Sequence, residues 1–194
     1  MSVCAIPGLN LSVSPEQVPP PRMPLPPAMD CGVAILAGGC FWCSEAVFGA
    51  LGGVRGIAPG YAGGRAERAN YEAVCTGVSG HAEVIRIEYD PAVIGFPALL
   101  QVFFAVAHDA TQLNRQGNDI GTQYRSAIFP LDDAQRAEAE AAIIRAQPDW
   151  PAPIVTTIEA ATTWYPAEDY HQDYWVGEGQ RNSYCLAVIP PKLA

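Results

Sequence analysis

Residues 33–51 carry the pattern that most constrains how this chain can fold. The apolar run VAILA at 33–37 has the length of a buried strand, and two glycines end it. The sequence from Phe41 to Leu51 then favours a helix. This order places Cys40 where a buried strand passes into a helix. We therefore expect a core strand followed by a helix that begins immediately after Cys40.

The rest of the chain after Gly32 mixes strand-like and helix-like patterns. Further strands are predicted at 54–58, 84–89, 124–129 and 154–159. Helices are predicted at 96–108, at 133–146 with Asp132 as N-cap, and at 166–176 opening on Pro166. A chain of 194 residues, 49% of them hydrophobic, is long enough for one sizeable core. The pattern predicts an α+β fold: a ferredoxin-like two-layer sandwich with helices packed on a central mixed sheet.

Two parts of the chain are expected to lie outside this packed core. Seven prolines between positions 15 and 27 remove backbone donors and favour extended conformations. Residues 1–31 are therefore predicted to be a flexible, proline-rich extension. Residues 32–194 are predicted to form one catalytic domain, and the stretch GEGQRNS at 177–183 predicts a mobile C-terminal segment because it is polar and contains glycine.

Charge and hydropathy exclude several classes of partner. The net charge of -9 argues against nucleic acid and anionic membrane as main partners. No apolar stretch approaches the roughly 20 residues needed to span a bilayer. The first residues lack both a basic opening and a continuous apolar block, so no secretory signal is expected. We expect a cytoplasmic monomer with a small or peptide ligand.

The cysteines point to redox chemistry. Of six cysteines, only Cys40 and Cys43 form a C-x-x-C pair, and a helix N-terminus lowers the pKa of a thiol. Phe41 and Trp42 could form an apolar substrate pocket beside it. The alternative is that both thiols are small buried hydrophobic groups.

Two other functions fit the C-x-x-C pair taken alone. A strand, a C-x-x-C pair and a helix are also the context of a thioredoxin-like dithiol-disulfide oxidoreductase. A non-catalytic metal-binding protein could use the two thiols with His81, His108 or His171. A second pair of ligands is missing from the sequence, and we expect no bound metal.

Four segments together resemble one family. The segment GGCFWCSEAVF at 38–48 resembles the GCFWxxE motif of the MsrA peptide methionine sulfoxide reductases, and ANYEAVCTGVSGHAEVIRIEYDP at 69–91 contains the family's tyrosine segment and GHAE motif. Residues 115–129 are similar to its QGxDxGTQYRS motif, and residues 166–175 to its AExYHQxY segment. The resemblance covers about 34–191, and the four motifs follow in the family's order.

The resemblance implies a role for each matching residue. Cys40 is the nucleophile that attacks the sulfur of an S-epimer methionine sulfoxide, and Glu83 of GHAE is the acid that protonates the oxygen. Tyr71 and Tyr124 match the tyrosines that hydrogen-bond this oxygen, and Asp119 matches the site aspartate. A carboxyl group near apolar walls has a raised pKa and can hold its proton, which suits Glu83. A solvated carboxylate at position 83 and a turn-stabilising Asp119 are the structural alternatives.

Two thiols are candidates to resolve the sulfenic acid that forms on the nucleophile. Cys43 lies one helical turn from it, and Cys185 lies on a segment that could fold over the site; Cys185 is slightly favoured. The resemblance implies thioredoxin as the reductant, replaced by dithiothreitol in vitro, and no bound cofactor. Cys75 is expected to be a packed thiol, and Cys4 and Cys31 to be incidental. Glu45 is expected in the first turn of the helix, where it would complement the dipole.

Overall fold

The structure, a computed structural model, describes residues 31–160 and 163–193. The predicted extension at 1–31 lies outside this range except for Cys31. Within the described residues, no helix is long and apolar enough to span a membrane.

The centre of the fold is a βαββαβ unit. In chain order its elements are β1 (Gly32–Gly38), α1 (Phe41–Gly49), β2 (Val54–Ala62), β3 (Ala82–Tyr89), α3 (Phe96–Val102) and β6 (Ser126–Ile128). β1 pairs antiparallel with both β3 and β6, and β3 pairs antiparallel with β2, so the strand order is β6-β1-β3-β2. This topology confirms the predicted ferredoxin-like fold.

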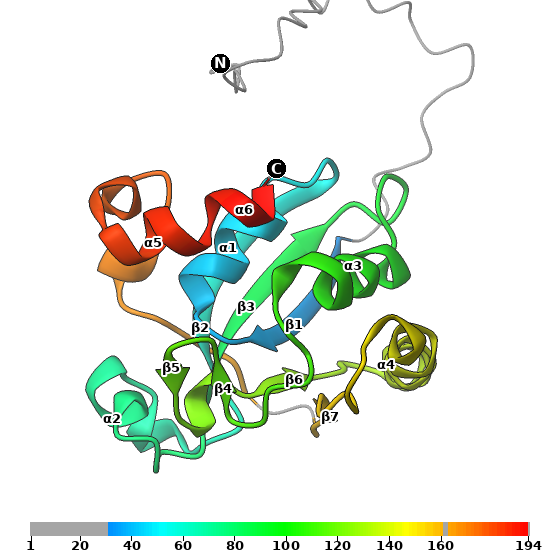
Figure 1. Ribbon diagram of the computed structural model, residues 1–194, viewed down its shortest axis with the longest axis horizontal. Helices are drawn as coiled ribbons and strands as arrows, with labels where there is room; N and C mark the ends of the chain where they lie inside the picture. Colours follow the sequence, from blue (N-terminus) through cyan, green and yellow to red (C-terminus); the bar gives the residue numbers. More distant parts are fainter. Residues whose placement is uncertain (1–30, 161–162, 194) are drawn as a thin grey trace, which may run out of the picture.

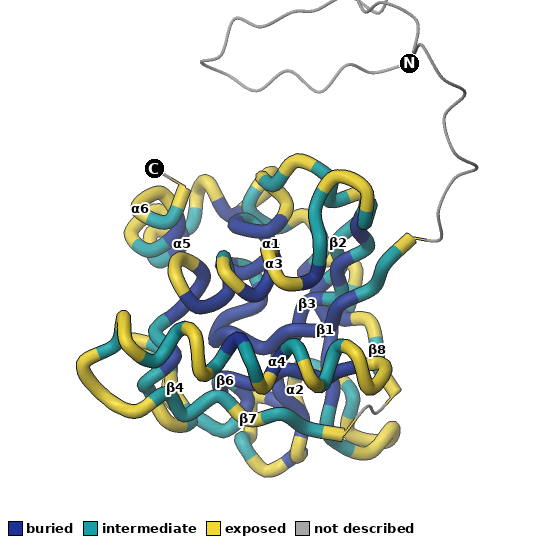
Figure 2. Tube along the Cα trace, turned by 90° about the vertical axis from the view of Figure 1, so that its right-hand side faces the viewer, coloured by how far each residue is buried: buried dark blue, intermediate teal, exposed yellow. Residues whose placement is uncertain are grey.

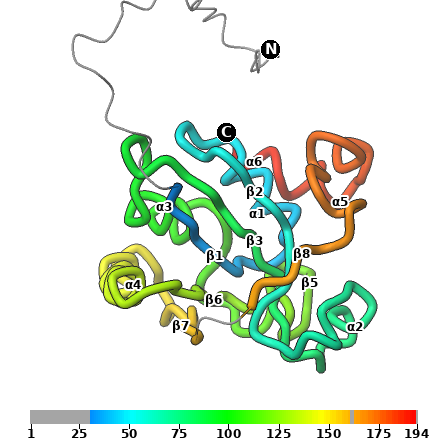
Figure 3. The backbone as a smooth tube through the Cα atoms, turned by 180° about the vertical axis from the view of Figure 1, so that it is seen from behind, coloured from blue at the N-terminus to red at the C-terminus, as the bar shows by residue number. Residues whose placement is uncertain are grey.

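Short strands extend this sheet at both edges. β7 (Thr157–Ile158) lies parallel to β6, and β8 (Tyr165–Pro166) lies antiparallel to β2. The parallel pair makes the sheet mixed, as predicted. Seen from behind, β8 runs beside β2, so residues near position 166 lie close to the β2 edge (Figure 3).

The alternating side chains of the central strands divide the interior into two clusters. Ala34, Leu36, Ile85 and Ile87 face the larger cluster, which includes apolar side chains of α1 and α3. The residues that alternate with them, such as Ile35 and Val84, face a smaller cluster on the other side of the sheet. The trace of β1, β3 and α1 is mostly buried, whereas α4 (Asp133–Ala146) alternates between exposed and half-buried residues and buries only Ala139 and Ala142 (Figure 2). The core therefore lies between the sheet and the helices α1 and α3.

The remaining elements surround the C-terminal end of β1. They are α2 (Tyr71–Cys75), the π-helix η3 (Phe103–Ala107), the hairpin β4 (Arg115–Gln116) and β5 (Asp119–Ile120), η4 (Thr122–Tyr124), η6 (Asp169–His171), α5 (Ser183–Val188) and α6 (Pro190–Leu193). The short 3-10 helices η2 (Ala66–Arg68), η5 (Gln147–Asp149) and η7 (Glu178–Arg181) complete the described structure. Figure 1 shows α5 and α6 lying over α1. The chain thus places its last two helices beside the turn that carries Cys40.

Several predicted elements are confirmed and one is wrong. The helix at 133–146 has the predicted bounds, and the Asp132 side chain caps it by accepting a hydrogen bond from Gln135 N at 2.7 Å. The predicted helix at 96–108 is α3 continued by η3. The strands predicted at 124–129 and 154–159 are shorter, at 126–128 and 157–158.

The predicted helix at 166–176 is instead β8 followed by a single 3-10 turn. Its polar side chains bond to distant parts of the fold. Gln172, for example, donates to the carbonyl oxygen of Pro59 at 3.1 Å. Asp173 has φ of +51°, which a continuous helix does not allow. Long-range contacts therefore replace the helix that local sequence favours.

Candidate active site

Cys40 lies at the N-cap position of α1, directly after two glycines. Gly39 has φ of +81°, and a Cβ there would lie 2.5 Å from Cβ of Gln116. The Gln116 amide is held by the backbone of Asp109, with hydrogen bonds of 3.1 Å at both ends. Gly39 is therefore required by the turn and by the close approach of β4. The predicted position of Cys40 at the start of the helix is confirmed.

Glu83 on β3 lies next to this turn and is only 2% exposed. Its Oε2 accepts a hydrogen bond from the backbone N–H of Phe41 at 3.0 Å. The carboxyl group thus binds the first N–H of α1, where Cys40 makes no side-chain cap. Burial raises the pKa of Glu83 to about 8, despite the opposing Phe41 hydrogen bond. The acid holds its proton at neutral pH.

Cys40 and Cys43 titrate as a pair. The hydrogen bond from Cys40 is the largest cause that lowers the pKa of Cys43. The same hydrogen bond, then burial and the nearby charges of Cys43 and Glu83, raise the pKa of Cys40 well above its usual value. The predicted lowering at Cys40 is therefore wrong for the resting protein. The physical reason is that Glu83 occupies the helix N–H of Phe41, and that two buried thiols share the stabilisation of one thiolate.

Tyr71 and Tyr124 lie in the same buried region as Glu83. Tyr71 begins α2, and Tyr124 ends η4. Burial first, and among the smaller causes the charges of Glu83 and Cys40, raise the pKa of both phenols. Both are therefore neutral hydrogen-bond donors at physiological pH. The structure brings these two tyrosines together with Cys40 and Glu83, although they come from separate segments.

Glu168 holds Tyr61 and the start of α2, which carries Tyr71, and was not singled out in the sequence. Its carboxylate accepts a hydrogen bond from the Tyr61 hydroxyl at 2.8 Å and another from the Tyr71 backbone N–H at 2.9 Å. These bonds join β2, the start of α2 and the C-terminal region. The pKa of Glu168 is lowered by these hydrogen bonds, although burial opposes them. The AExYHQ motif contains this residue, but its hydrogen bonds are to Tyr71 and Tyr61, which lie 97 and 107 positions earlier in the sequence.

Aromatic rings surround His171, which is buried on η6. Its ring centroid lies 5.0 Å from that of Phe41, 5.4 Å from Trp42 and 4.4 Å from Tyr71. The indole of Trp42 also stacks on Tyr174, with centroids 3.8 Å apart and rings inclined by 12°. Phe41 is fully buried, whereas Trp42 stays partly exposed. The predicted pocket aromatics thus form one continuous apolar wall with His171.

Cys185 on α5 is fully buried and packs in one cluster with Cys40 and Cys43. The Asn182 side chain caps α5 by accepting hydrogen bonds from the Tyr184 and Cys185 N–H groups at 2.9 and 3.3 Å. Burial, followed by the charge of Cys43, raises the pKa of Cys185 to about 11. The segment that was predicted to be mobile therefore contains a helix whose thiol is directed into the site.

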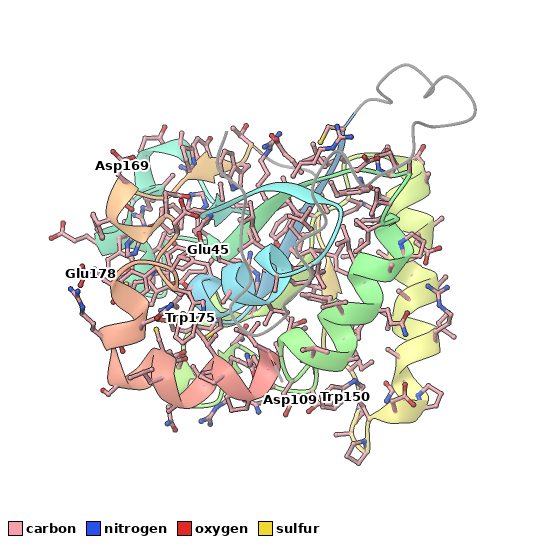
Figure 4. The ribbon with its side chains drawn as sticks, turned by 90° about the horizontal axis from the view of Figure 1, so that it is seen from above. Glu45, Asp109, Trp150, Asp169, Trp175 and Glu178 are labelled. Carbon is pink, nitrogen blue, oxygen red and sulfur yellow. The ribbon has the colours of Figure 1, made fainter. Side chains whose placement is uncertain are left out.

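Glu45 holds the chain that leads to α5, at Asp173 and Tyr174, against α1. Its carboxylate accepts hydrogen bonds from the backbone N–H groups of Asp173 and Tyr174 at 2.7 and 3.0 Å. Figure 4 shows Glu45 on the side of α1 that faces the segment carrying Asp169 and Trp175. Burial raises the pKa of Glu45 to about 7. The predicted helix-dipole role is wrong, because Glu45 lies beyond the first turn and binds a distant backbone.

Asp119 joins the same region from β5. The hydroxyl of Tyr184, which precedes Cys185, donates a hydrogen bond to the Asp119 carboxylate. A small cavity of about 180 Å³ lies between α1, the β4–β5 hairpin and the last two helices, and Cys40, Cys43, Tyr184 and Lys192 are among its lining residues. Asp119 therefore anchors α5 at the edge of the site.

His81 and His108 are held by hydrogen bonds to the protein itself. His81 lies between the N–H of Gly64 and the carbonyl of Arg65, and His108 between Ser126 and the Phe103 carbonyl. In residues 31–160 and 163–193, no group of three or more potential ligand side chains could hold a metal ion. Cys75 is exposed, so its prediction as a packed thiol is wrong.

Residues 32–194 match the peptide methionine sulfoxide reductase family. The chain belongs to this family. A peptide methionine sulfoxide reductase MsrA from Erwinia tasmaniensis is 64% identical over 160 residues, which cover 82% of this chain and 89% of the relative. Membership confirms the family predicted from the four motifs and identifies the chain as an oxidoreductase.

Solved structures of relatives support the same family fold. Reduced Mxr1 from Saccharomyces cerevisiae is 37% identical, with a TM-score of 0.74 over 77% of this chain and 87% of that chain. Mxr1 in complex with Trx2 is 28% identical, with a TM-score of 0.54 over 73% and 84% of the two chains. The α+β architecture of this reductase is thus shared with experimentally determined relatives.

Proposed function

We propose that this peptide methionine sulfoxide reductase reduces the S epimer of methionine sulfoxide, free or in peptides, with electrons from thioredoxin. One observation carries the proposal. A buried carboxyl group with a pKa of about 8 lies beside the Cys40 turn, fixed by the Phe41 N–H at 3.0 Å. A sulfoxide reductase needs this combination, because the sulfur must be attacked while its oxygen receives a proton.

In the proposed first step, the thiolate of Cys40 attacks the sulfoxide sulfur. Glu83 gives a proton to the sulfoxide oxygen, and Tyr71 and Tyr124 donate hydrogen bonds to it. The S–O bond of the substrate breaks, the oxygen is transferred to Cys40, and methionine leaves. The substrate sulfur gains the two electrons that the Cys40 sulfur loses, and Cys40 becomes a sulfenic acid.

The charge state of Glu83 makes this step feasible. The hydrogen bond with Cys43 and burial are the largest causes of the raised pKa of Cys40, and the negative charge of Glu83 adds to them. Because burial keeps Glu83 protonated at neutral pH, this repulsion is largely absent when the substrate binds. A neutral acid and a thiolate can therefore occupy one buried site. The apolar wall of Phe41, Trp42 and His171 would receive the methyl group of the substrate.

The proposed second step closes a disulfide. A thiol of Cys185 or Cys43 attacks the sulfenic sulfur of Cys40, an S–S bond forms, and the oxygen leaves as water. Both thiols belong to the buried cluster that contains Cys40. Thioredoxin would then reduce the disulfide by exchange; the complex of the relative Mxr1 with Trx2 supports this choice of reductant.

The purified protein with dithiothreitol is expected to form methionine from the S epimer of methionine sulfoxide and at least about 100-fold less from the R epimer. The expectation rests on a buried site in which the acid lies at one fixed position. Amino-acid analysis of the products measures it. Absence of methionine from the S epimer, or reduction of insulin disulfides without sulfoxide turnover, would contradict the proposed function.

Cys185→Ser is expected to form about one equivalent of methionine and then stop when thioredoxin is the reductant. All three thiols are buried in the resting fold, but Cys40 and Cys43 lie at the start of α1 in the core, whereas Cys185 lies on the six-residue helix α5 that packs over them. Movement of α5 away from α1 would therefore bring the disulfide to thioredoxin, and it requires the α5 thiol. Rapid quench followed by intact mass measures the burst and the trapped species. Cys31→Ser, a change of an exposed thiol, is the control. Full thioredoxin-dependent turnover by Cys185→Ser would assign the resolving role to Cys43 alone.

A further inference from the structure

Lys192 on α6 brings a positive charge to the cavity beside the two thiols of α1. The cavity of about 180 Å³ is lined by residues of α1, the β4–β5 hairpin, α5 and α6, and among the described residues that line it Lys192 is the one cation. Cys40 and Cys43 line the same space. An ammonium group in a small, partly closed cavity interacts strongly with a thiolate, because little water screens the two charges.

The Lys192 ammonium group is held in place. Its Nζ donates a hydrogen bond to the carbonyl oxygen of Ala107 at 2.7 Å. Ala107 is the last residue of η3, so this carbonyl belongs to a helix C-terminus. Lys192 is half-buried, and the Ala107 carbonyl is a neutral acceptor. The ammonium group is therefore fixed beside the cavity and keeps its full charge.

The groups that face Cys43 are mostly acids and thiols. They are Cys40 on its own helix, Glu83 on β3, Asp119 on β5, Tyr184 and Cys185 on α5, and Lys192 on α6. The hydrogen bond from Cys40 is the largest cause that lowers the pKa of Cys43; burial opposes it, and the charge of Lys192 lowers the pKa further. Cys185 has no such help, and burial raises its pKa to about 11.

We propose that Lys192 is a positioning residue for disulfide formation: it stabilises the thiolate of Cys43 and so selects Cys43 as the first thiol to attack oxidised Cys40. The thiolate of Cys43 attacks the sulfenic sulfur of Cys40, the S–S bond forms as the S–O bond breaks, and hydroxide leaves as water with the proton that Cys43 released. Cys43 is oxidised and Cys40 is reduced from the sulfenic to the disulfide level. Cys185 then attacks Cys43 and carries the disulfide to thioredoxin.

This inference rests on the proposed function and adds a role for the end of the chain. The last two helices would supply two separate parts of the recycling apparatus: α5 supplies a thiol, and α6 supplies the cation that directs the order of attack. If α6 undocks from η3, the Lys192 charge leaves the cavity and Cys43 loses the part of its advantage over Cys185 that this charge supplies.

Two variants of the full chain test the inference, because they separate charge from hydrogen bonding. Lys192→Gln keeps a donor for the Ala107 carbonyl but removes the charge, whereas Lys192→Arg keeps both. The thiolate of Cys43 is titrated by its ultraviolet absorbance in the reduced protein, with Cys43→Ser as the blank. We expect Lys192→Gln to lower the thiolate fraction of Cys43 at neutral pH about tenfold, which equals one unit in pKa. Lys192→Arg should stay close to the wild type.

The rate of Cys40–Cys43 disulfide formation is the second readout, followed by rapid quench and peptide mass after one equivalent of S-epimer sulfoxide. Lys192→Gln should slow it about tenfold at neutral pH, with recovery at higher pH, and Lys192→Arg should restore it. An unchanged titration in Lys192→Gln would overturn the inference, as would an equal slowing in both variants. The titration requires no substrate, so its outcome is distinguishable from a failure of the proposed sulfoxide reduction.

Discussion

Replacing Cys40 by serine is expected to abolish sulfoxide reduction, with a loss of at least about 10⁴-fold in kcat, the scale seen when a nucleophile is removed. The proposed reaction transfers oxygen to the attacking atom, and a serine oxygen could accept it only as a peroxide. A serine hydroxyl is also far less ionised than a thiol at neutral pH. Methionine formation from the S epimer with dithiothreitol measures the loss, and dithiothreitol removes any dependence on recycling.

Two controls separate loss of the nucleophile from damage to the fold. Cys40 is only 7% exposed, but serine is close in size and the residue makes no side-chain cap to α1, so Cys40→Ser should unfold close to the wild type. Cys31→Ser changes a thiol that is exposed at the start of β1 and should keep full activity. Retention of activity by Cys40→Ser together with its loss in Cys43→Ser would show that Cys43 is the nucleophile.

Local sequence patterns predicted the part of the site that lies within one strand and one helix. The apolar run, the paired glycines and the following helix correctly located Cys40 at the start of α1. The helix cap at Asp132 was predictable for the same reason, since a cap is a contact between residues three positions apart. The mixture of strands and helices predicted an α+β fold with helices on a central sheet, whereas the strand order β6-β1-β3-β2 depends on pairing between distant segments.

Contacts between distant segments decided what local patterns could not predict. The region 166–176 has a helical pattern, yet Gln172 bonds to Pro59 across 113 positions and the helix does not form. Glu45 was expected to serve its own helix but binds backbone groups 128 and 129 positions away. The pKa of Cys40 is raised first by Cys43 and by burial, and further by Glu83, which comes from another strand. The family motifs named most of these residues, and only the fold shows how they act on one another.

Replacing Glu83 by glutamine is expected to lower kcat for the S epimer by about 10²- to 10⁴-fold at neutral pH, the usual contribution of a general acid. Glutamine has almost the same shape and keeps an oxygen that can accept the Phe41 N–H bond, so the start of α1 should be preserved. It carries no acidic proton for the sulfoxide oxygen. Steady-state rates across pH measure the effect, and Glu140→Gln on the exposed face of α4 is the matched control.

The pH profile gives the same prediction a second readout. Because the pKa of Glu83 is about 8, the acid form is present below this pH and is lost above it. Because the Cys40 thiol ionises at a still higher pH, the wild-type rate should rise with pH and level off past about 8, and the rate of Glu83→Gln should continue to rise. A wild-type rate that keeps rising well above this pH would argue against a general-acid role for Glu83.

Glu83→Gln should raise the stability of the protein at pH 8 although it lowers the activity. The pKa of Glu83 is raised from 4.5 in the unfolded chain to about 8 in the fold, so folding favours the protonated form. The contribution of Glu83 to the free energy of unfolding should then decrease as pH rises from about 4.5 to 8, by about a few kcal/mol. Glu83→Gln removes this contribution, whereas both proteins keep those of other shifted groups, such as Glu45 with a pKa of about 7 and buried His108 with a pKa of about 4, so the difference between wild type and variant isolates Glu83. Denaturant unfolding of both proteins at several pH values measures this difference in the free energy of unfolding. A variant that is more stable than the wild type at pH 8 but inactive would show that the site keeps a costly buried acid for the sake of its proton.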